Sequence, residues 1–406
     1  MSFVFVATAC TGAIDAPEDG AGGDGSTGGS ASGATGGSAP RGGSSGSGGS
    51  SGASPSGGSA GKGSAGSSSK GGSGGSAGSA GKAGSGGTAG SISAGAGGSA
   101  GTPGSGGIGS APSGVGPQVG ACPMFPVDDA WNQDISAAAA DPEWTRRIHE
   151  LVGDVNIHPD FGGSGDELYG IPINVVPATQ LAVPVVFDWY EDESDPGPYP
   201  FPAPGLALIE GNSPLECDGD CHYIVVQEGT CELFEGYACY FEAGWHCGGG
   251  ARWDLRRVSY GQREKGWTSA DAAGLAIAPG VLRYDEVRAG AVRHALRFTV
   301  PCTRANYVAP ATHQAVPNDC DADDPNAPPM GLRVRLRADY DISRASPSAQ
   351  VVLNGMKRYG MILADNGSSF YFQGEANAGW NDDDIEPLKD VPASAFEVIS
   401  MPPMED

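Results

Sequence analysis

The sequence predicts an all-β protein of the β-sandwich or jelly-roll kind with one or two covering helices, and an α+β fold is the alternative. Three observations favour this fold class. Short runs rich in Val, Ile, Phe and Tyr recur in the C-terminal part of the chain, Pro and Gly separate these runs, and only two segments carry a long helical pattern. Many short strands with frequent turns are typical of sandwiches and barrels.

The chain of 406 residues changes composition near residue 117. Residues 20–117 are almost entirely Gly, Ser and Ala, a composition that buries too little apolar surface to offset the entropy of ordering. We expect this segment to be a flexible tether with a root-mean-square span of roughly 50–60 Å. Residues 118–406 have the apolar and aromatic content of one globular domain.

Residues 1–19 are expected to be a truncated signal peptide and anchor region. Ala7-Thr8-Ala9-Cys10 follows a short apolar run and resembles the cleavage site of bacterial lipoproteins. This resemblance implies a lipid on Cys10 and an extracellular location on the cell surface, as an outer-membrane lipoprotein. An ordinary secretory signal, in which Cys10 is incidental, is the alternative.

The formal net charge of −25 falls entirely on residues 118–406, because four basic and four acidic side chains balance before them. A domain this acidic repels phosphate backbones and anionic headgroups. We therefore expect no nucleic-acid partner, contact with a membrane only through the lipid at Cys10, and a monomer.

Of the nine cysteines, Cys10 stands alone and eight lie in the globular part. An even number beside a linker of this kind predicts up to four disulfides, formed in an oxidising compartment. Their connectivity cannot be read from the spacing. The eight are Cys122, Cys217, Cys221, Cys231, Cys239, Cys247, Cys302 and Cys320.

Caps and apolar spacing predict two helices. Residues 141–152 begin with Asp141 as the N-cap, and residues 346–359 begin with Ser346 and end before Gly360. Each has apolar residues along one face, so each helix should cover a sheet.

Alternation of apolar and polar residues predicts the strands. Asn366-Gly367 predicts a hairpin between residues 361–365 and 369–373. Residues 245–254 are Gly-rich and are expected to be a loop that enters a strand at Arg252. Further strands are predicted over residues 171–176, 183–189, 222–226, 231–241, 281–285, 291–300, 331–342 and 396–399.

The alternation places five arginines on the outward faces of two strands, among them Arg297 and Arg335. On an acidic domain, such a face is a candidate for binding substrate. The other interpretation is a solvated face paired with Asp and Glu.

Five segments resemble a family of secreted bacterial proteins that is known only as uncharacterised. The resemblance covers about residues 122–400. It implies one intact, secreted domain, and it implies no activity, cofactor or catalytic residue. The segments are GWTSADAAGL (266–275), RYDEV (283–287), RHALRFTVP (293–301), MGLRVRL (330–336) and YGMILADNGS (359–368).

Residues 217–254 hold five cysteines, two histidines and two tryptophans among acidic side chains, and we place the candidate site there. Residues 118–406 lack G-x-S-x-G, H-E-x-x-H, a P-loop and a Rossmann fingerprint. Esterases with a nucleophile elbow, common zinc proteases and nucleotide-binding enzymes are therefore disfavoured.

Carboxylates, histidine and aromatic rings on a β scaffold favour glycoside hydrolysis, which needs one protonated and one ionised carboxyl group. We predict Glu235 and Asp254 as this pair, with His222 and Asp220 beside them. Asp285, Glu286 and Asp365 are further candidate carboxylates. The predicted sugar-stacking rings are Trp245, Trp253, Trp267 and Trp380.

Two other functions use the same residues. A lyase for uronate polysaccharides would neutralise the substrate carboxylate with the arginines and use His222 or His294 as the base. A module that binds a polysaccharide or cell-envelope glycan without catalysis, or a structural envelope lipoprotein, needs no acid pair.

No cofactor is certain from the sequence, and structural calcium is the candidate. Asp319, Asp321 and Asp323 match the D-x-D-x-D start of an EF-hand loop, but the Gly and the final Glu of that loop are missing. The alternative is a surface loop closed by Cys302 and Cys320.

Overall fold

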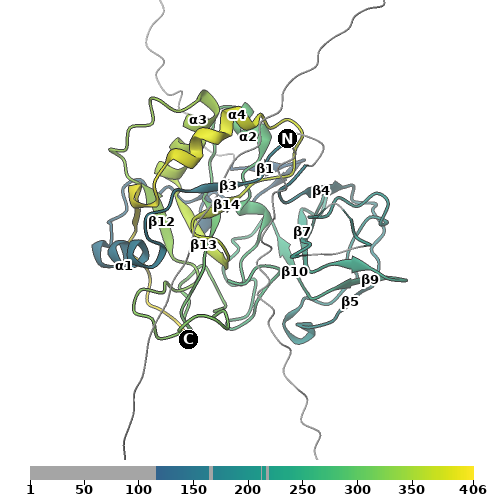
Figure 1. Cartoon of the computed structure of the whole chain (residues 1–406). Coiled ribbons are helices and arrows are strands. Elements are labelled where there is room, and N and C mark those ends of the chain that lie inside the picture. The colour runs from purple at the N-terminus through teal and green to yellow at the C-terminus, as the bar shows by residue number, and fades with distance from the viewer. Residues whose placement is uncertain (1–115, 164–167, 212, 216–218) are drawn as a thin grey trace, which may run out of the picture. The chain divides into compact units, whose positions relative to one another are not determined.

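The computed structural model describes residues 116–163, 168–211, 213–215 and 219–406 (Figure 1). The signal region, Cys10, most of the tether and Cys217 lie outside these residues, so the expectations about them stay predictions. The described part is built mostly from β-strands, with four short α-helices. This confirms the predicted all-β fold with few helices. Within the same ranges, no helix is long and apolar enough to cross a bilayer.

The larger sheet has six strands in the order β15-β12-β13-β11-β14-β3. Its central strands β11 and β13 run parallel, while β14 and β12 join them antiparallel. β11 is buried along its whole length, which explains its nearly continuous apolar run. The bounds are β3 His158–Asp160, β11 Leu296–Val300, β12 Arg333–Leu336, β13 Met361–Asn366, β14 Tyr371–Gln373 and β15 Phe396–Val398.

The two longer helices begin as predicted. Asp141 caps α1 (Pro142–Val152) by accepting two backbone hydrogen bonds, and Ser346 caps α3 (Pro347–Arg358) by accepting one. Gly360 follows α3 with a φ of 72°, a left-handed conformation that glycine adopts without strain. The two short helices are α2 (Tyr284–Arg288) and α4 (Asp382–Ile385).

A second sheet has four strands in the order β10-β7-β6-β4, in which β4 and β6 are parallel and the other pairs antiparallel. A third sheet has the order β5-β9-β8, and β1 pairs with β2. The bounds are β1 Gln118–Val119, β2 Cys122–Pro123, β4 Ile173–Val176, β5 Val185–Phe187, β6 Tyr223–Gln227, β7 Glu232–Tyr237, β8 Tyr240–Phe241, β9 Trp245–Cys247 and β10 Gly249–Asp254.

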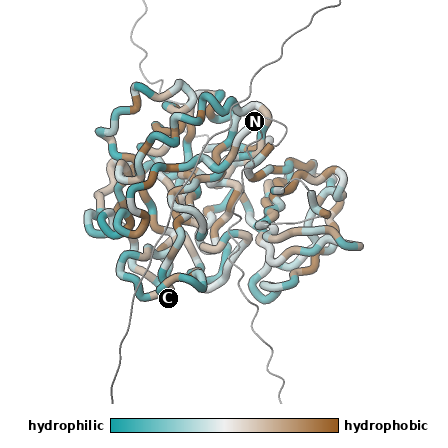
Figure 2. The backbone as a smooth tube through the Cα atoms, viewed as in Figure 1, coloured by the Kyte–Doolittle hydropathy of each residue, from teal (hydrophilic) through white to brown (hydrophobic). Residues whose placement is uncertain are grey.

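The four-stranded sheet separates two hydrophobic cores. Ile224 and Leu233 belong to the larger core, which includes the six-stranded sheet, whereas Tyr223 and Phe234 belong to a smaller core that contains Trp245 of β9. Successive residues of a strand point to opposite faces, so β6 and β7 each contribute to both cores. Figure 2 shows hydrophobic segments running through both parts of the domain.

Three predicted elements are wrong. Asn366-Gly367 does not close a hairpin, because β11 lies between β13 and β14, and the Gly367 N–H donates to the Val300 carbonyl at the end of β11. Residues 281–285 lead into helix α2 rather than forming a strand. Residues 245–254 form β9 and β10, since their glycines allow close packing inside the sheets.

The prediction of disulfides is confirmed for the described residues. Cys122–Cys231 connects β2 to the start of β7, and Cys239–Cys247 joins the turn between β7 and β8 to the end of β9. Cys302–Cys320 closes a surface loop. Cys221 is also disulfide-bonded.

Candidate functional site

Glu235 lies within β7 and is fully buried. Its carboxyl group accepts hydrogen bonds from Nε1 of Trp253 (3.1 Å) and from the backbone N–H groups of Ile277 and Ala278 (both 2.9 Å). Burial raises the pKa of Glu235 to about 7, although these three donors oppose the shift. The carboxyl group therefore anchors the turn at residues 277–280 to the sheet, out of reach of a substrate.

Asp254, the predicted partner of Glu235, points away from it. Glu235 pairs with Ala251 across the two strands, and Asp254 lies three residues further along β10. An odd offset directs the two side chains to opposite faces of the sheet. Asp254 is partly exposed and accepts a hydrogen bond from Nε of Arg256 at 3.0 Å. The structure thus does not bring the predicted acid pair together.

Most of the predicted sugar-stacking rings are core residues. Trp245, Trp253 and Trp380 are each exposed by 5% or less. Trp267 is half-buried, with the guanidinium of Arg263 5.5 Å from its ring centre. The exposed tryptophan is Trp189, directly after β5.

A different group of charged side chains connects the six-stranded sheet to the start of β6. We call Glu210, His222, Asp271, Arg297 and Asp365 the charged cluster. Nη2 of Arg297 donates to Oδ1 of Asp271 at 2.6 Å and lies 3.4 Å from Oδ2 of Asp365. Arg297 also interacts electrostatically with Glu210 and His222. The five residues come from four segments: Glu210 and His222 from the connection before β6, Asp271 from a loop, Arg297 from β11 and Asp365 from β13.

A β-bulge places Asp365 in this cluster. Phe298 of β11 pairs with Leu363 of β13, but the next residue of β11 pairs with Asp365, so Ala364 is an extra residue. Without it, Asp365 would lie on the face opposite to Arg297. The extra residue reverses the alternation and puts both side chains on the same face.

The carboxyl groups of Asp271 and Asp365 both hold a proton more readily than an exposed aspartate does. Burial is the largest cause and raises the pKa of both carboxyl groups, while Arg297 lowers both. The charge of Asp271 raises the pKa of Asp365 further, whereas a hydrogen bond with Asp365 lowers that of Asp271. The pKa of Asp365 reaches about 7. The side chain of Asp271 is fully buried, whereas that of Asp365 is 25% exposed. Asp365 is therefore the member that can exchange a proton with a ligand.

Glu210 is held in the opposite protonation state. Nδ1 of His222 donates to Oε2 of Glu210 at 2.6 Å, and Nε2 donates to the carbonyl of Ala270 at 3.2 Å. Because both ring nitrogens face acceptors, the ring carries two protons. Burial opposes that charge, but Glu210 outweighs burial and raises the pKa of His222 to about 9. In turn, His222 outweighs burial and holds the pKa of Glu210 below its usual range.

Two more carboxyl groups lie around the cluster. Asp220, one of the predicted catalytic residues, is exposed and interacts electrostatically with Asp365. Asp160 ends β3, and burial followed by the charge of Glu210 raises its pKa, while a hydrogen bond from Gln373 opposes the shift.

Buried polar atoms without partners are found in the same place. Oδ2 of Asp271, Nε of Arg297 and Oε1 of Gln373 are buried and make no hydrogen bond within the described ranges. A buried polar atom left unsatisfied costs about 1–3 kcal/mol. These are three of eleven such atoms in the described residues, so they are compatible with a site at the cluster but do not by themselves mark one.

The five arginines do not form one outward face, although Arg337 is exposed. Arg297 and Arg333 are buried, and Arg335 is bound to Glu397 at 2.9 Å. The inner strands of this sheet are covered on both faces, so alternation along them does not separate core from solvent. His294, a candidate base of the lyase, is also buried, with Nε2 2.9 Å from Oε2 of Glu286, so it is a core residue.

No group of three His, Cys, Asp or Glu side chains in the described part of the chain is arranged to hold a metal ion. Asp319, Asp321 and Asp323 lie on an exposed loop, where the Asp321 carboxyl accepts the N–H of Asp323 at 3.0 Å. Calcium binding by this loop stays a prediction, while the disulfide that closes the loop is present.

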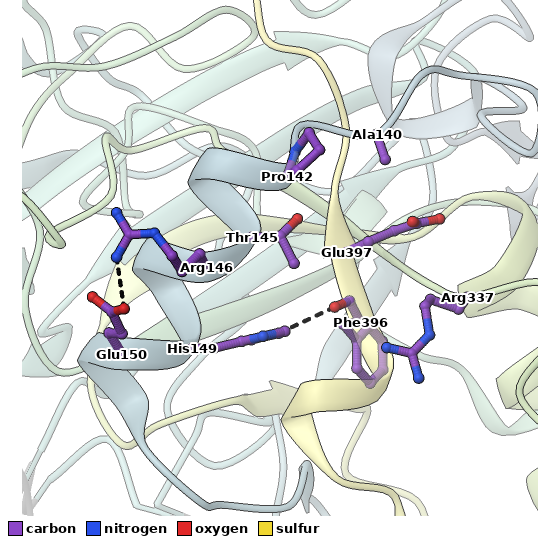
Figure 3. A pocket seen from close by; sticks show the side chains of 9 residues that line it. All are labelled: Ala140, Pro142, Thr145, Arg146, His149, Glu150, Arg337, Phe396 and Glu397. Carbon is purple, nitrogen blue, oxygen red and sulfur yellow. Dashed lines mark hydrogen bonds and ion pairs between the residues drawn. The ribbon is translucent and has the colours of Figure 1, made fainter.

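A hollow of about 530 Å³ lies beside α1 and β15 and shares no residue with the charged cluster (Figure 3). Its charged side chains already have partners. Arg146 pairs with Glu150 at 2.6 Å, and Nε2 of His149 lies 3.1 Å from the carbonyl of Phe396. Its two carboxyl groups, Glu150 and Glu397, are each paired with an arginine, so the hollow is the weaker candidate.

Sequence patterns indicate His222 and Asp220 but not Glu210 or Asp271, and they place Asp365 only among further candidate carboxylates. A signal for the cluster was present in the segments that resemble the family of secreted proteins. GWTSADAAGL contains Asp271, RHALRFTVP contains Arg297, and YGMILADNGS contains Asp365.

Comparison of the chain with protein-family models, curated proteins and solved structures finds no match. The resemblance to a family of secreted bacterial proteins therefore stays a prediction. A function is therefore proposed from the chemistry of the charged cluster.

Proposed function

We propose that the domain hydrolyses glycosidic bonds, with Asp365 as the general acid and Glu210 as the ionised partner. The observation that carries this proposal is a pair of partly exposed carboxyl groups with different surroundings: Glu210 binds the ring of His222 at 2.6 Å, whereas Asp365 lies beside a second carboxyl group and Arg297. Arg297 interacts with both, so they belong to one site. Glycoside hydrolysis needs one carboxyl group to protonate the leaving oxygen and another, ionised, to activate water or attack the sugar.

Three buried groups set these states. Asp271 and Arg297 lie behind Asp365 and tune how readily it holds a proton. His222 donates to the carboxylate of Glu210 through its ring and through its backbone N–H (3.2 Å), which keeps Glu210 ionised and oriented. His222 is thus a positioning residue rather than a base.

The proposal includes secretion and attachment to the cell surface. The disulfides support an oxidising compartment. The lipid at Cys10 and the Gly/Ser/Ala tether would provide a flexible anchor.

The alternative of a uronate lyase has less support. Such an enzyme needs a cation for the substrate carboxylate and a neutral base. Arg297 is bound by two aspartates, Arg335 is bound by Glu397, and His222 already carries two protons. A non-catalytic carbohydrate-binding module is the second candidate, which the exposed ring of Trp189 favours.

The test measures new reducing ends, and the ultraviolet absorbance of unsaturated uronates, after incubation of the full chain with a polysaccharide panel. Asp365→Asn and Glu210→Gln should each lower the rate by about 10²–10⁴-fold. Asp254→Asn, a partly exposed carboxyl on the other side of the sheet, is the matched control and should keep full activity.

Three results would contradict hydrolysis at this site. Full activity in both Asp365→Asn and Glu210→Gln would exclude these residues. Products with ultraviolet absorbance would favour a lyase. Retention on a polymer without any cleavage would favour a binding module.

A further inference from the structure

We propose that the ring of Trp189 is the sugar-stacking platform of this site and that the site selects a neutral or amino-bearing sugar chain over an anionic one. The inference rests on the proposed function, for which it names the substrate class.

Trp189 is 61% exposed, whereas the other tryptophans are buried or half-buried. A large apolar ring on the surface is costly to hydrate, and contact with the apolar face of a ligand removes that cost. Flat aromatic rings and the axial C–H face of a pyranose are complementary in shape. An exposed indole beside a carboxyl pair therefore fits a sugar-binding subsite.

The ring of Trp189 is held in a fixed position. Its backbone N–H donates to the carbonyl of Gly248 at 3.2 Å, and the ring lies so close to Gly248 that a Cβ there would be 2.4 Å from the ring carbon Cε3. Tyr237 packs against the ring at 5.9 Å between ring centres. Gly248 follows Cys247, which the disulfide to Cys239 ties to the same region. A ring that is already oriented loses little entropy when it binds.

Tyr237 connects this platform to the charged cluster. Its ring centre lies 6.0 Å from that of His222. Burial, and then the charges of Asp220 and Asp365, raise the pKa of its hydroxyl group. Two ring contacts thus lead from Trp189 to the proposed acid and its ionised partner. A chain of sugars bound at the carboxyl pair would place a neighbouring unit on Trp189.

The charge around the platform disfavours anionic sugars. Residues 148–251, which supply Trp189, Tyr237, Glu210 and Asp220, contain no Lys or Arg. Asp188 precedes Trp189, and the acidic turn Glu191–Glu193 follows it. Arg263 and Arg297 reach this region from outside that range, but both are buried and already bound to aspartates. A uronate would therefore meet net repulsion here, whereas an amino sugar would be attracted.

The test measures the Kd of the full chain for cellohexaose, chitohexaose, hexaglucosamine and hexagalacturonate by calorimetry, with all variants in the Asp365→Asn background so that the ligands stay intact. Trp189→Ala and Gly248→Ala should weaken binding of a non-anionic hexamer about tenfold, and Trp189→Phe should retain most of the affinity. Gly244→Ala is the matched control, since a Cβ at Gly244 meets open space.

Unchanged affinity in Trp189→Ala, tightest binding of hexagalacturonate, or no binding of any hexamer would overturn the inference. The outcome can be separated from that of the proposed function. Cleavage that depends on Asp365 but not on Trp189 overturns only the inference, and binding that depends on Trp189 without cleavage by the unmodified chain overturns only hydrolysis.

Discussion

Glu235 and Asp365 are two carboxyl groups whose pKa is raised to about 7, and burial is the largest cause for both. They differ in what surrounds them. Glu235 is closed off and satisfied by three N–H donors, whereas Asp365 is 25% exposed and lies beside a second carboxyl and a cation. A raised pKa therefore indicates a functional site only when the group is accessible and other charged groups lie beside it.

The largest difference between the two groups should be in activity. Asp365→Asn should lower kcat on a cleaved polysaccharide about 10²–10⁴-fold, because the acid is lost, while Glu235→Gln should keep kcat within about threefold. Steady-state kinetics of the two purified variants measure this. Equal losses of kcat in both would break the comparison.

The two arginines of the sheet should differ next most. Arg297→Met leaves Asp271 and Asp365 without their buried cation and should lower the free energy of unfolding by about 3–5 kcal/mol. Arg335→Met removes a less buried pair with Glu397 and should cost about 1 kcal/mol or less. Urea unfolding followed by circular dichroism compares them. Equal losses would argue that Arg297 has no special role in the cluster.

Glu235 should make stability depend on pH. Its pKa in the folded protein is above the unfolded value of 4.5, so the folded state keeps a proton that the unfolded chain releases. The free energy of unfolding should therefore fall as the pH rises from about 4.5 through about 7. Glu235→Gln should lower stability by about 1–3 kcal/mol at acidic pH, where its amide group faces N–H donors, and should flatten this slope. An unchanged slope of melting temperature against pH in the variant would contradict the account.

Asp254→Asn should have the smallest effect. The side chain is partly exposed and its ion pair with Arg256 lies at the surface, so the free energy of unfolding should change by no more than about 0.5 kcal/mol. Thermal unfolding of this variant alongside Glu235→Gln gives the contrast between the two residues that the sequence places together. A loss of stability as large as that of Glu235→Gln would show that Asp254 contributes more to the free energy of unfolding than its exposure indicates.

Local rules predict local structure well in this chain. Asp141 and Ser346 mark the helix starts because a cap needs only its own helix, and alternation finds most strands. The order of strands depends on distant segments, so the Asn366-Gly367 turn is misread as a hairpin although β11 lies between the two strands.

The site depends on still more distant facts. Asp365 lies on the same face of the sheet as Arg297 because Ala364 is an extra residue, and no local sequence pattern predicts that bulge. Alternation predicts that Arg297 points outward, because a sequence does not show that both faces of a strand are covered. The density of cysteine and aromatic residues in 217–254 reflects cross-links and core packing more than chemistry, and of the predicted residues there, His222 and Asp220 lie at the cluster.

The central claim is that Asp365 and Glu210 are held in opposite protonation states, and it can be tested without knowing the substrate. Carbon-13 NMR of the full chain with labelled Asp and Glu carboxyl groups follows each titration. We expect an aspartate signal that titrates near pH 7 and is absent from Asp365→Asn. We also expect a glutamate signal that titrates below the usual range and moves to higher pH in His222→Gln. If every aspartate has released its proton by about pH 5, or if Glu210 titrates with the exposed glutamates, the carboxyl pair proposed here does not exist.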